Sequence, residues 1–514
     1  MKYKGLYITL FVLTVALLAF PVVQQYGRWF KFKPLNGATV AVEQPQLSFK
    51  SFMSGAFQRQ EDQYLAEHIG FREPMVRCYN QLSWSLFRKP QNKSIYVTKD
   101  NWIYNDFMIQ HRDRQYVYEY GESNEAVVER MRASSIMLYQ LQEVLKGYGV
   151  SLFVCMTPAK DLVCGEHLEQ EHRSYDRPPG VLAIDFYPPI FDSLGINYLN
   201  LSDYFMRIKD TVSYPLYLKS SFHWSLEAAC YTADTLVKYM ESLSGINMHN
   251  PLYSAPYLAE TRTPDGDLEE LMNLLWPVES NTNYYVNVSV DNDSTAEKPK
   301  WLIVGDSYFW EWQYGLPLGQ MFDTYHYWYY NNTIYNDLLH TNVSQVDLLR
   351  ELLSTDVVML IYSPSNLYDL NRDFLTKSLF ALCFEDGTVN RMMEKIAQDI
   401  KNTPEWYASI EQKANASGQD VNQLVEDNAR YMLMGTPAVY FDEFKEAKTL
   451  QSRNSRIATI LEQLHDMKRE DYRQQIYSNS QWLEAIKEKA RQQGCTIEEA
   501  MEKDIDWLIK NEAL

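Results

Sequence analysis

The sequence predicts an α/β protein in which helices cover a mostly parallel sheet, with an apolar helix before this body and an all-helical extension after it. Three observations predict this architecture. Short apolar runs typical of buried strands alternate with stretches of helical periodicity between residues 124 and 361. Residues 6–23 carry no charge, and beyond about residue 390 the strand patterns end. Alternating strands and helices favour a layered sandwich.

The apolar segment near the N-terminus is long enough for a membrane anchor. Lys2 and Lys4 precede 18 uncharged residues, and about 20 apolar residues span a bilayer. A cleaved signal peptide is the alternative, but Phe20-Pro21-Val22 does not provide a cleavage site with two small residues. We expect residues 7–23 to be an uncleaved, single-pass anchor in the inner (cytoplasmic) membrane. The long remainder would then be extracytoplasmic, in the periplasm of a Gram-negative source.

The elements of the body follow from the periodicity of apolar residues. Residues 124–147 predict a helix, and residues 226–240 predict a second one with an inner stripe of small and apolar side chains. Residues 151–156, 196–199, 301–304 and 357–361 predict strands. We divide the chain into a cytoplasmic stub with the anchor, a polar lead-in, an α/β domain and a helical extension, over residues 1–25, 26–95, 96–390 and 391–514.

The helical extension contains an internal repeat. Its positions recur at an offset of 76 residues, for example Trp406 with Trp482 and Gly418 with Gly494. Each copy predicts a helix, a Gly that ends it and a second helix. A further helix is expected between the copies, at residues 456–470. A repeated helical hairpin indicates packing or interaction rather than chemistry.

Composition excludes some functions. The net charge is −19, and no run of Lys and Arg could neutralise nucleic-acid phosphates. The six Cys form no CxxC pair, so a zinc or redox motif is not supported, and no His and Asp spacing predicts a metal site. Aromatic residues reach 14%, which suits either sugar stacking or a Tyr-rich core.

The strongest candidate for chemistry is the sequence Gly305-Asp306-Ser307, which follows a predicted buried strand. Ligands of open α/β sheets bind beyond the carboxyl ends of the strands. A Ser there, after a Gly that permits a sharp turn, can present its hydroxyl as a nucleophile and its N–H to an oxyanion. The alternative is a plain turn.

A serine nucleophile needs a base, and His223 is the best candidate among nine His. It lies in a loop before a predicted helix, where functional residues collect, and Trp224 beside it could restrict the ring. Taken alone, His223 is better explained by a structural role. Paired with Gly-Asp-Ser on the same sheet, it becomes a candidate general base.

The order of the motifs resembles the SGNH-hydrolase-like proteins of the alginate O-acetyltransferase type, the AlgX and AlgJ group. The resemblance covers residues 60–370 and places the His before the Ser. In chain order, its motifs are Gly70-Phe71-Arg72, Thr157-Pro158-Ala159-Lys160, Ser221-Phe222-His223-Trp224, Gly266-Asp267-Leu268 and Gly305-Asp306-Ser307.

The resemblance implies an SGNH-hydrolase-like three-layer sandwich and transfer of acetyl groups to hydroxyls of an exported polysaccharide. Ser307 would carry the acyl group, and His223 would move the protons. A membrane-bound O-acyltransferase would be the partner that supplies the acyl donor. The chain has no phosphate-binding Gly-rich loop and no implied cofactor, which agrees with a protein that does not bind acetyl-CoA.

This chain departs from the family pattern at Ser221, where the resemblance implies the Asp that orients the His. A hydroxyl can bond the imidazole but cannot stabilise its charged form as a carboxylate does. Asp203, Asp161 or Asp267 could replace it, Ser307 and His223 could work alone as a slow dyad, or the protein could be inactive. Other oxyanion or substrate candidates are Gly305, Asp306, Tyr308, Asn331 and Asn332, and also Ser363 and Asn366.

Three functions remain open on the sequence. The first is an extracytoplasmic, serine-dependent O-acetyltransferase acting on a polysaccharide. The second is a carbohydrate acetylesterase, in which water instead of a sugar attacks the acyl-enzyme. The third is a scaffold or carbohydrate-binding component of a polysaccharide-modification complex, which Ser221 and the helical repeat favour. A carboxylate bonded to His223 would count against the scaffold.

Overall fold

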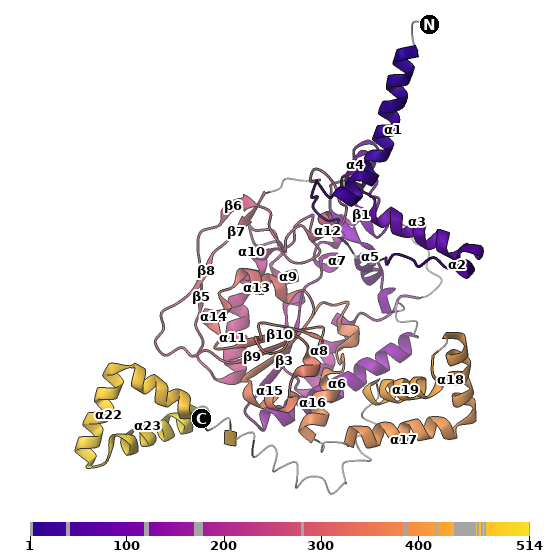
Figure 1. Ribbon diagram of the computed structural model, residues 1–514. Helices are drawn as coiled ribbons and strands as arrows, with labels where there is room; N and C mark the ends of the chain where they lie inside the picture. Colours follow the sequence, from indigo (N-terminus) through magenta and orange to yellow (C-terminus); the bar gives the residue numbers. More distant parts are fainter. Residues whose placement is uncertain are drawn as a thin grey trace.

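The computed structural model describes residues 4–37, 42–117, 123–168, 178–278, 282–383, 388–417, 419–435 and 469–512, with a few isolated positions between 459 and 466. Figure 1 shows a central α/β body, from which helix α1 extends at one end and the last helices lie apart at the other. The 456–470 helix expected from the sequence falls largely outside the described residues.

A six-stranded sheet forms the centre of the body. Its order is β11-β10-β9-β12-β3-β4. All neighbouring pairs are parallel except β10 and β11, which form an antiparallel pair at one edge. The strands are β3 (Ser151–Met156), β4 (Tyr198–Asn200), β9 (Trp301–Gly305), β10 (Tyr325–Tyr329), β11 (Thr333–Tyr335) and β12 (Val357–Tyr362). This mostly parallel sheet confirms the predicted fold class.

Helices cover both faces of the sheet, because its fully buried strands alternate their side chains between two cores. Leu302 and Val304 enter one core, and Trp301 and Ile303 enter the other. The first core is closed by α6 (Asn124–Lys146), α8 (Ala183–Leu194), α15 (Leu348–Ser354) and α16 (Phe374–Cys383). The second is closed by α9 (Leu201–Ile208), α10 (Leu226–Tyr231), α11 (Ala233–Ser244), α13 (Phe309–Gly315) and α14 (Leu318–Met321).

The helix predicted over residues 226–240 is divided in two at Thr232. The Thr232 hydroxyl donates to the carbonyl of Ala229 at 2.6 Å. The indole Nε1 of Trp312 donates to the same carbonyl and to the Thr232 hydroxyl, both at 3.0 Å. These side chains take the carbonyl that would continue the helix, so α10 ends and α11 begins. The inner stripe is nevertheless buried as expected.

Small antiparallel pairs surround the site side of the body. They are β1 (Ile95–Val97) with β2 (Ile103–Asn105), β5 (Pro251–Tyr253) with β8 (Val288–Val290), and β6 (Tyr257–Glu260) with β7 (Thr282–Tyr285). Three short helices lie among them: α5 (Asp106–Arg112), α7 (Lys160–Val163) and α12 (Asp267–Glu270).

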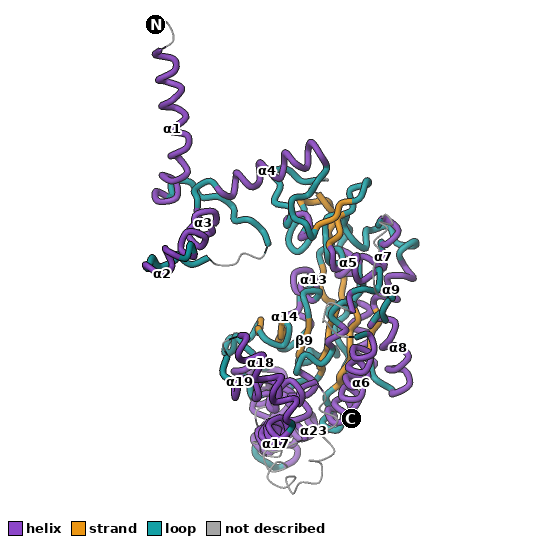
Figure 2. The backbone as a smooth tube through the Cα atoms, turned by 90° about the vertical axis from the view of Figure 1, so that its right-hand side faces the viewer, coloured by secondary structure: helices purple, strands orange, loops and turns teal. Residues whose placement is uncertain are grey.

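Helix α1 (Lys4–Gly27) is the predicted apolar segment. By length and composition it could cross a membrane, with a mean hydropathy of 2.5, and none of that window is buried in the fold. Helices α2 (Phe49–Met53), α3 (Ala56–His68) and α4 (Arg72–Phe87) follow it, and α4 leads to the body in Figure 2. Gly70 permits close packing there, because a Cβ would lie 2.2 Å from the Pro21 carbonyl oxygen.

The described part of the C-terminal extension is all-helical, as predicted. Helix α17 (Thr388–Asn402) precedes α18 (Pro404–Ser417) and α19 (Val421–Gly435), which form the helix pair expected for the first repeat. The second repeat is the pair α22 (Ser480–Gln493) and α23 (Ile497–Glu512), joined at Gly494 in the left-handed conformation (φ +66°). Ile410 and its repeat partner Ile486 are both buried in the cores of their pairs.

Candidate active site

Ser307 lies at the carboxyl edge of the sheet, between β9 and α13. Strand β9 lies between β10 and β12 and is buried along its length. Gly305 ends this strand, and a Cβ there would lie 1.9 Å from the carbonyl oxygen of Ile361 in β12. Gly305 is therefore required by a close approach of two strands. The positive φ expected for a sharp turn is not found there.

The loop that carries His223 is held by a buried lysine. Lys160 is fully buried, and its ammonium group donates to the carbonyls of Ile103, Lys219 and Ser221 at 2.7–2.8 Å. Burial lowers the pKa of Lys160 to about 7, whereas three carbonyl acceptors favour its charged form. The lysine of the Thr157-Pro158-Ala159-Lys160 motif thus fixes the loop two residues before the imidazole.

A continuous chain of hydrogen bonds joins Ser307, His223 and Asp267. The Oγ of Ser307 is 2.8 Å from His223 Nε2, and His223 Nδ1 is 2.7 Å from Asp267 Oδ2. The other oxygen of Asp267 accepts the backbone N–H groups of Phe222 and Leu268, at 2.6 and 2.9 Å. These two donors fix the carboxylate, so that it can hold the imidazole with Nε2 facing the hydroxyl.

Asp267, one of the three acids considered from the sequence, occupies the place expected of the missing Asp. The other two pair elsewhere, Asp161 with His111 and Asp203 with Arg207. Ser221 does not bond the imidazole, since Ser307 and Asp267 take both ring nitrogens. Its buried hydroxyl instead accepts the N–H of Gly266 at 2.7 Å. Ser221 therefore positions the loop that delivers Asp267.

Asp306 connects the carboxyl end of β9 with the segment that follows β12. It is fully buried, and its carboxylate accepts the N–H groups of Tyr308 at 3.1 Å and Ser363 at 2.7 Å. The side-chain amide of Asn366 also donates to it at 2.8 Å. Through these hydrogen bonds, Asp306 holds the end of β9 against the end of β12. Ser363 and Asn366 do meet this sheet edge, as expected from the sequence.

The remaining sequence candidates have other partners in the described structure. Asn331 donates its amide to the Arg372 carbonyl at 2.8 Å, and Asn332 accepts from the Asn342 amide at 2.9 Å. Both follow β10 at the turn toward β11. The Tyr308 ring packs edge-on against the His223 imidazole, with centroids 4.8 Å apart. No group of three His, Cys, Asp or Glu suited to a metal ion is present among the described residues.

Residues 97–322 match the family model described as the SGNH hydrolase-like domain of the acetyltransferase AlgX. This match agrees with the resemblance that the order of the motifs indicated. The chain is also similar to three solved structures at low identity, and no curated protein matches it.

The first of these structures is the O-acetyltransferase domain of Pseudomonas putida AlgJ, which is 14% identical over 54% of this chain and 92% of its own (TM-score 0.37). The second is Pseudomonas aeruginosa AlgX, which is 14% identical over 56% of this chain and 71% of its own (TM-score 0.36). The third is Bacillus cereus PatB1, with 14% over 47% and 91% (TM-score 0.30).

A second carboxyl group lies close to the hydrogen-bonded chain of Ser307, His223 and Asp267. Glu311 is fully buried on α13, and its Oε1 is 3.7 Å from His223 Nδ1. Its Oε2 accepts the indole N–H of Trp224 at 3.2 Å, while Oε1 has no hydrogen-bond partner. Burial raises the pKa of Glu311 to about 8. Burial lowers the pKa of His223, but Glu311 and then Asp267 raise it by more, to about 9.

Sequence reasoning missed Glu311 and left the choice of acid open. Glu311 lies four residues after Ser307 where the chain enters α13, a spacing that brings side chains to one side of a helix. A carboxyl at that spacing behind a candidate nucleophile is a usable signal. The pairing of His223 with Asp267 joins two loops 44 residues apart, which no local spacing encodes.

Proposed function

We propose that the protein is an O-acetyltransferase that modifies hydroxyls of a cell-envelope or exported polysaccharide through a Ser307 acyl-enzyme. The observation that carries this proposal is the hydrogen-bonded chain from Ser307 through His223 to Asp267. The match of residues 97–322 to the family model of the acetyltransferase AlgX supports the reaction class.

In the first step, the Ser307 oxygen attacks the carbonyl carbon of the acetyl donor, and His223 Nε2 takes the hydroxyl proton. The bond from the carbonyl carbon to the donor oxygen then breaks, and the proton passes to that leaving oxygen. The product is an acetyl ester on Ser307. Asp267 holds the imidazole and stabilises its charged form while it carries the proton.

In the second step, an acceptor hydroxyl gives its proton to His223 Nε2 and its oxygen attacks the ester carbonyl. The Ser307 ester bond breaks, and the proton returns to the Ser307 oxygen. If water replaces the acceptor, the same chemistry makes the protein an acetylesterase. The Asp267 carboxylate beside His223 favours an enzyme over an inactive scaffold.

The proposal includes where the reaction takes place. Helix α1 would anchor the chain in the inner membrane, with the catalytic domain on the extracytoplasmic side. The acceptor would be a polysaccharide on that side. The donor would come from a membrane partner, a membrane-bound O-acyltransferase. Reconstitution with and without such a partner would test this part separately from the chemistry.

The chemistry is tested by hydrolysis of an aryl acetate, measured on the detergent-solubilised full chain. We expect Ser307→Ala and His223→Ala to lower kcat/KM by at least about a thousandfold, because neither variant can form the acyl-enzyme efficiently. Ser344→Ala and His249→Ala, both away from this hydrogen-bonded chain, are matched controls and should retain wild-type rates. Equal rates in all five proteins would overturn the proposal and favour the scaffold.

A further inference from the structure

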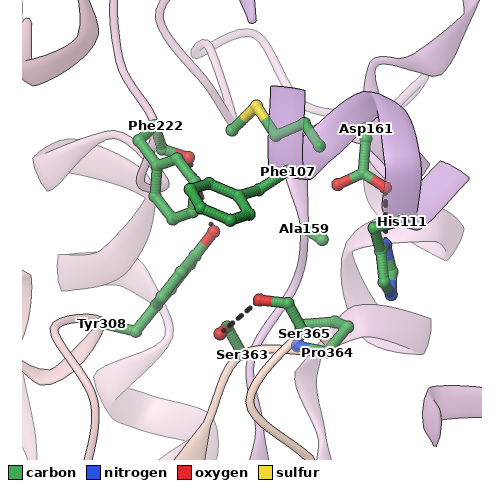
Figure 3. Close-up of a pocket in the computed structure, with 10 residues that line it drawn as sticks. Phe107, His111, Ala159, Asp161, Phe222, Tyr308, Ser363, Pro364 and Ser365 are labelled. Atoms are coloured by element: carbon green, nitrogen blue, oxygen red, sulfur yellow. Dashed lines mark hydrogen bonds and ion pairs between the residues drawn. The ribbon is translucent and has the colours of Figure 1, made fainter. Parts of the chain in front are cut away.

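A pocket adjoins the triad but belongs to none of the steps above. It is a small pocket, partly open to solvent, that lies between α5, the start of α7 and the loop after β12. Figure 3 shows Phe107, Phe222 and Tyr308 on one side of it and Asp161 with His111 on the other. Its walls therefore combine aromatic rings with a carboxylate, which is the usual composition of a site for a small polar ring.

The carboxylate of this pocket is held by its own histidine. Asp161 Oδ2 is 2.7 Å from His111 Nδ1, and their side chains are only 4% and 3% exposed. In Figure 3 the second carboxylate oxygen of Asp161 points away from His111, toward Phe107 across the pocket. A buried carboxylate is costly unless its oxygens find donors. Asp161 thus offers a fixed, buried acceptor to a ligand that enters with a donor.

The pocket shares its walls with the catalytic machinery. Phe222 and Tyr308 line the pocket and also pack edge-on against the His223 imidazole, with centroids 5.1 and 4.8 Å away. Ser363, another lining residue, donates its N–H to Asp306, the neighbour of Ser307. A molecule in the pocket would therefore lie beside the acyl-enzyme.

The charge of the pocket selects among acceptors. Among the described residues, its lining includes Asp161 and no Lys or Arg side chain. A sugar ring presents C–H groups that pack on aromatic rings and hydroxyls that donate to a carboxylate. A uronic acid ring would also bring a carboxylate of like charge close to Asp161, which is unfavourable because the Asp161 side chain is only 4% exposed.

We infer that this pocket is the acceptor subsite and that it takes a neutral sugar residue, with one hydroxyl donating to Asp161 and the ring packed against Phe107 and Phe222. The inference rests on the proposed function, and it specifies that the acceptor is a neutral sugar and not a uronic acid. Asp161 binds the acceptor and takes no part in forming the acyl-enzyme, so its removal should separate transfer from hydrolysis.

The test follows both reactions on the full chain with an aryl acetate as donor. Release of the aryl alcohol in buffer alone reports the acyl-enzyme and its hydrolysis. Mass spectrometry reports acetylation of added pentasaccharides of glucose, mannose or N-acetylglucosamine, and of two oligouronates of the same length. The proteins are the wild type, Asp161→Asn and Phe107→Ala. Asp291→Asn is the matched control, because Asp291 pairs with His249 at 3.0 Å outside this pocket.

We expect the wild type to acetylate at least one neutral pentasaccharide with a higher kcat/KM than either oligouronate. In Asp161→Asn the amide oxygen would take the place of the carboxylate oxygen on His111, and the N–H₂ group would replace the oxygen that points toward the pocket. That variant should lose about tenfold or more in the neutral-to-uronate ratio, with hydrolysis within about twofold of wild type. Phe107→Ala, a change at a half-exposed ring, should raise the acceptor KM and spare hydrolysis.

Three outcomes would overturn the inference. They are a preference for oligouronates, no transfer to any neutral acceptor by an enzyme that hydrolyses the donor, and an equal loss of transfer and hydrolysis in both pocket variants. Failure of the proposed function is a different result, since the wild type would then show no Ser307-dependent release of the aryl alcohol at all.

Discussion

The Ser307 site and the C-terminal helix pair both contain carboxylates, and the fold treats them in opposite ways. At the site, Glu311 is fully buried between the Trp224 indole and the His223 imidazole, and burial raises its pKa to about 8. In the helix pair, Glu502 is about one-third exposed and accepts hydrogen bonds from Arg473 and Arg469, which lower its pKa.

This difference shows that carboxyl groups with unfavourable surroundings are found at the Ser307 site and not in the described residues of the helix pair. In the helix pair, carboxylates lie beside Arg side chains at the surface, where an ion pair changes the free energy of unfolding very little. The site instead keeps two carboxyl groups around one imidazole, with one oxygen of Glu311 unpaired. Perturbed titration of this kind clusters at functional sites. The three predictions below test the contrast, beginning with the largest effect.

Asp267→Asn should have the largest effect. The Asn oxygen would keep the two backbone N–H groups that Asp267 Oδ1 now accepts. Its N–H₂ would then face His223 Nδ1 and force the tautomer that carries a proton on Nε2. That imidazole cannot accept the Ser307 proton, so kcat for aryl acetate should fall by on the order of 10⁴. The measurement is steady-state hydrolysis with thermal unfolding as a check of folding.

The control for this prediction is Asp203→Asn, which removes an acid exposed on α9 and paired with Arg207 at 2.6 Å. It should leave hydrolysis unchanged. If kcat of Asp267→Asn falls by less than about tenfold, Ser307 and His223 work as a dyad. The Asp267 carboxylate would then have a structural role, as the carboxylates of the helix pair do.

Glu311→Gln should have an intermediate effect, seen in the pH profile. Only the neutral imidazole accepts the Ser307 proton, so kcat/KM should rise with pH as His223 loses its proton, toward about pH 9. After burial, which lowers this pKa, Glu311 is the leading cause that raises it. A neutral Gln should therefore shift the rising limb to lower pH by on the order of one unit and increase activity near neutrality.

Glu351→Gln is the matched control for the pH profile. Glu351 bonds a different imidazole, His326, at 2.6 Å, and its removal should leave the rising limb in place. Gln at position 311 can still accept the Trp224 indole N–H, so the change removes charge and keeps the contact. Superimposable profiles for wild type and Glu311→Gln would show that Glu311 has no influence on the catalytic imidazole.

The same contrast explains how much the sequence could predict. The helix over residues 124–147 and the strands at 151–156, 301–304 and 357–361 were predictable, because their apolar patterns repeat locally. Ser307 and His223 could be named as candidates because one follows a buried strand and the other precedes a helix. Asp267 could only be named as a candidate, since Gly266 and the Ser221 hydroxyl bring its loop to the imidazole through contacts between distant segments.

Side-chain competition set a further limit on prediction. The division of the 226–240 helix at Thr232 depends on the indole of Trp312, which is 80 residues away. The pocket beside the triad combines residues from α5, α7 and the loop after β12, and none of these segments carries a motif for sugar binding by itself. Local sequence patterns therefore predict the helices and strands, whereas contacts between distant segments determine which side chains meet at the candidate site.

Glu502→Gln in the C-terminal helix pair should have the smallest effect. Its partners Arg469 and Arg473 keep Asp506 and Glu470 as second acceptors, and the exposed pairs are screened by water and salt. We expect the opening free energy of α23 to fall by less than about 1 kcal/mol, measured by hydrogen exchange of residues 497–512. Aryl acetate hydrolysis should not change. A loss of hydrolysis would mean that the helix pair communicates with Ser307, and the two regions could no longer be treated as independent.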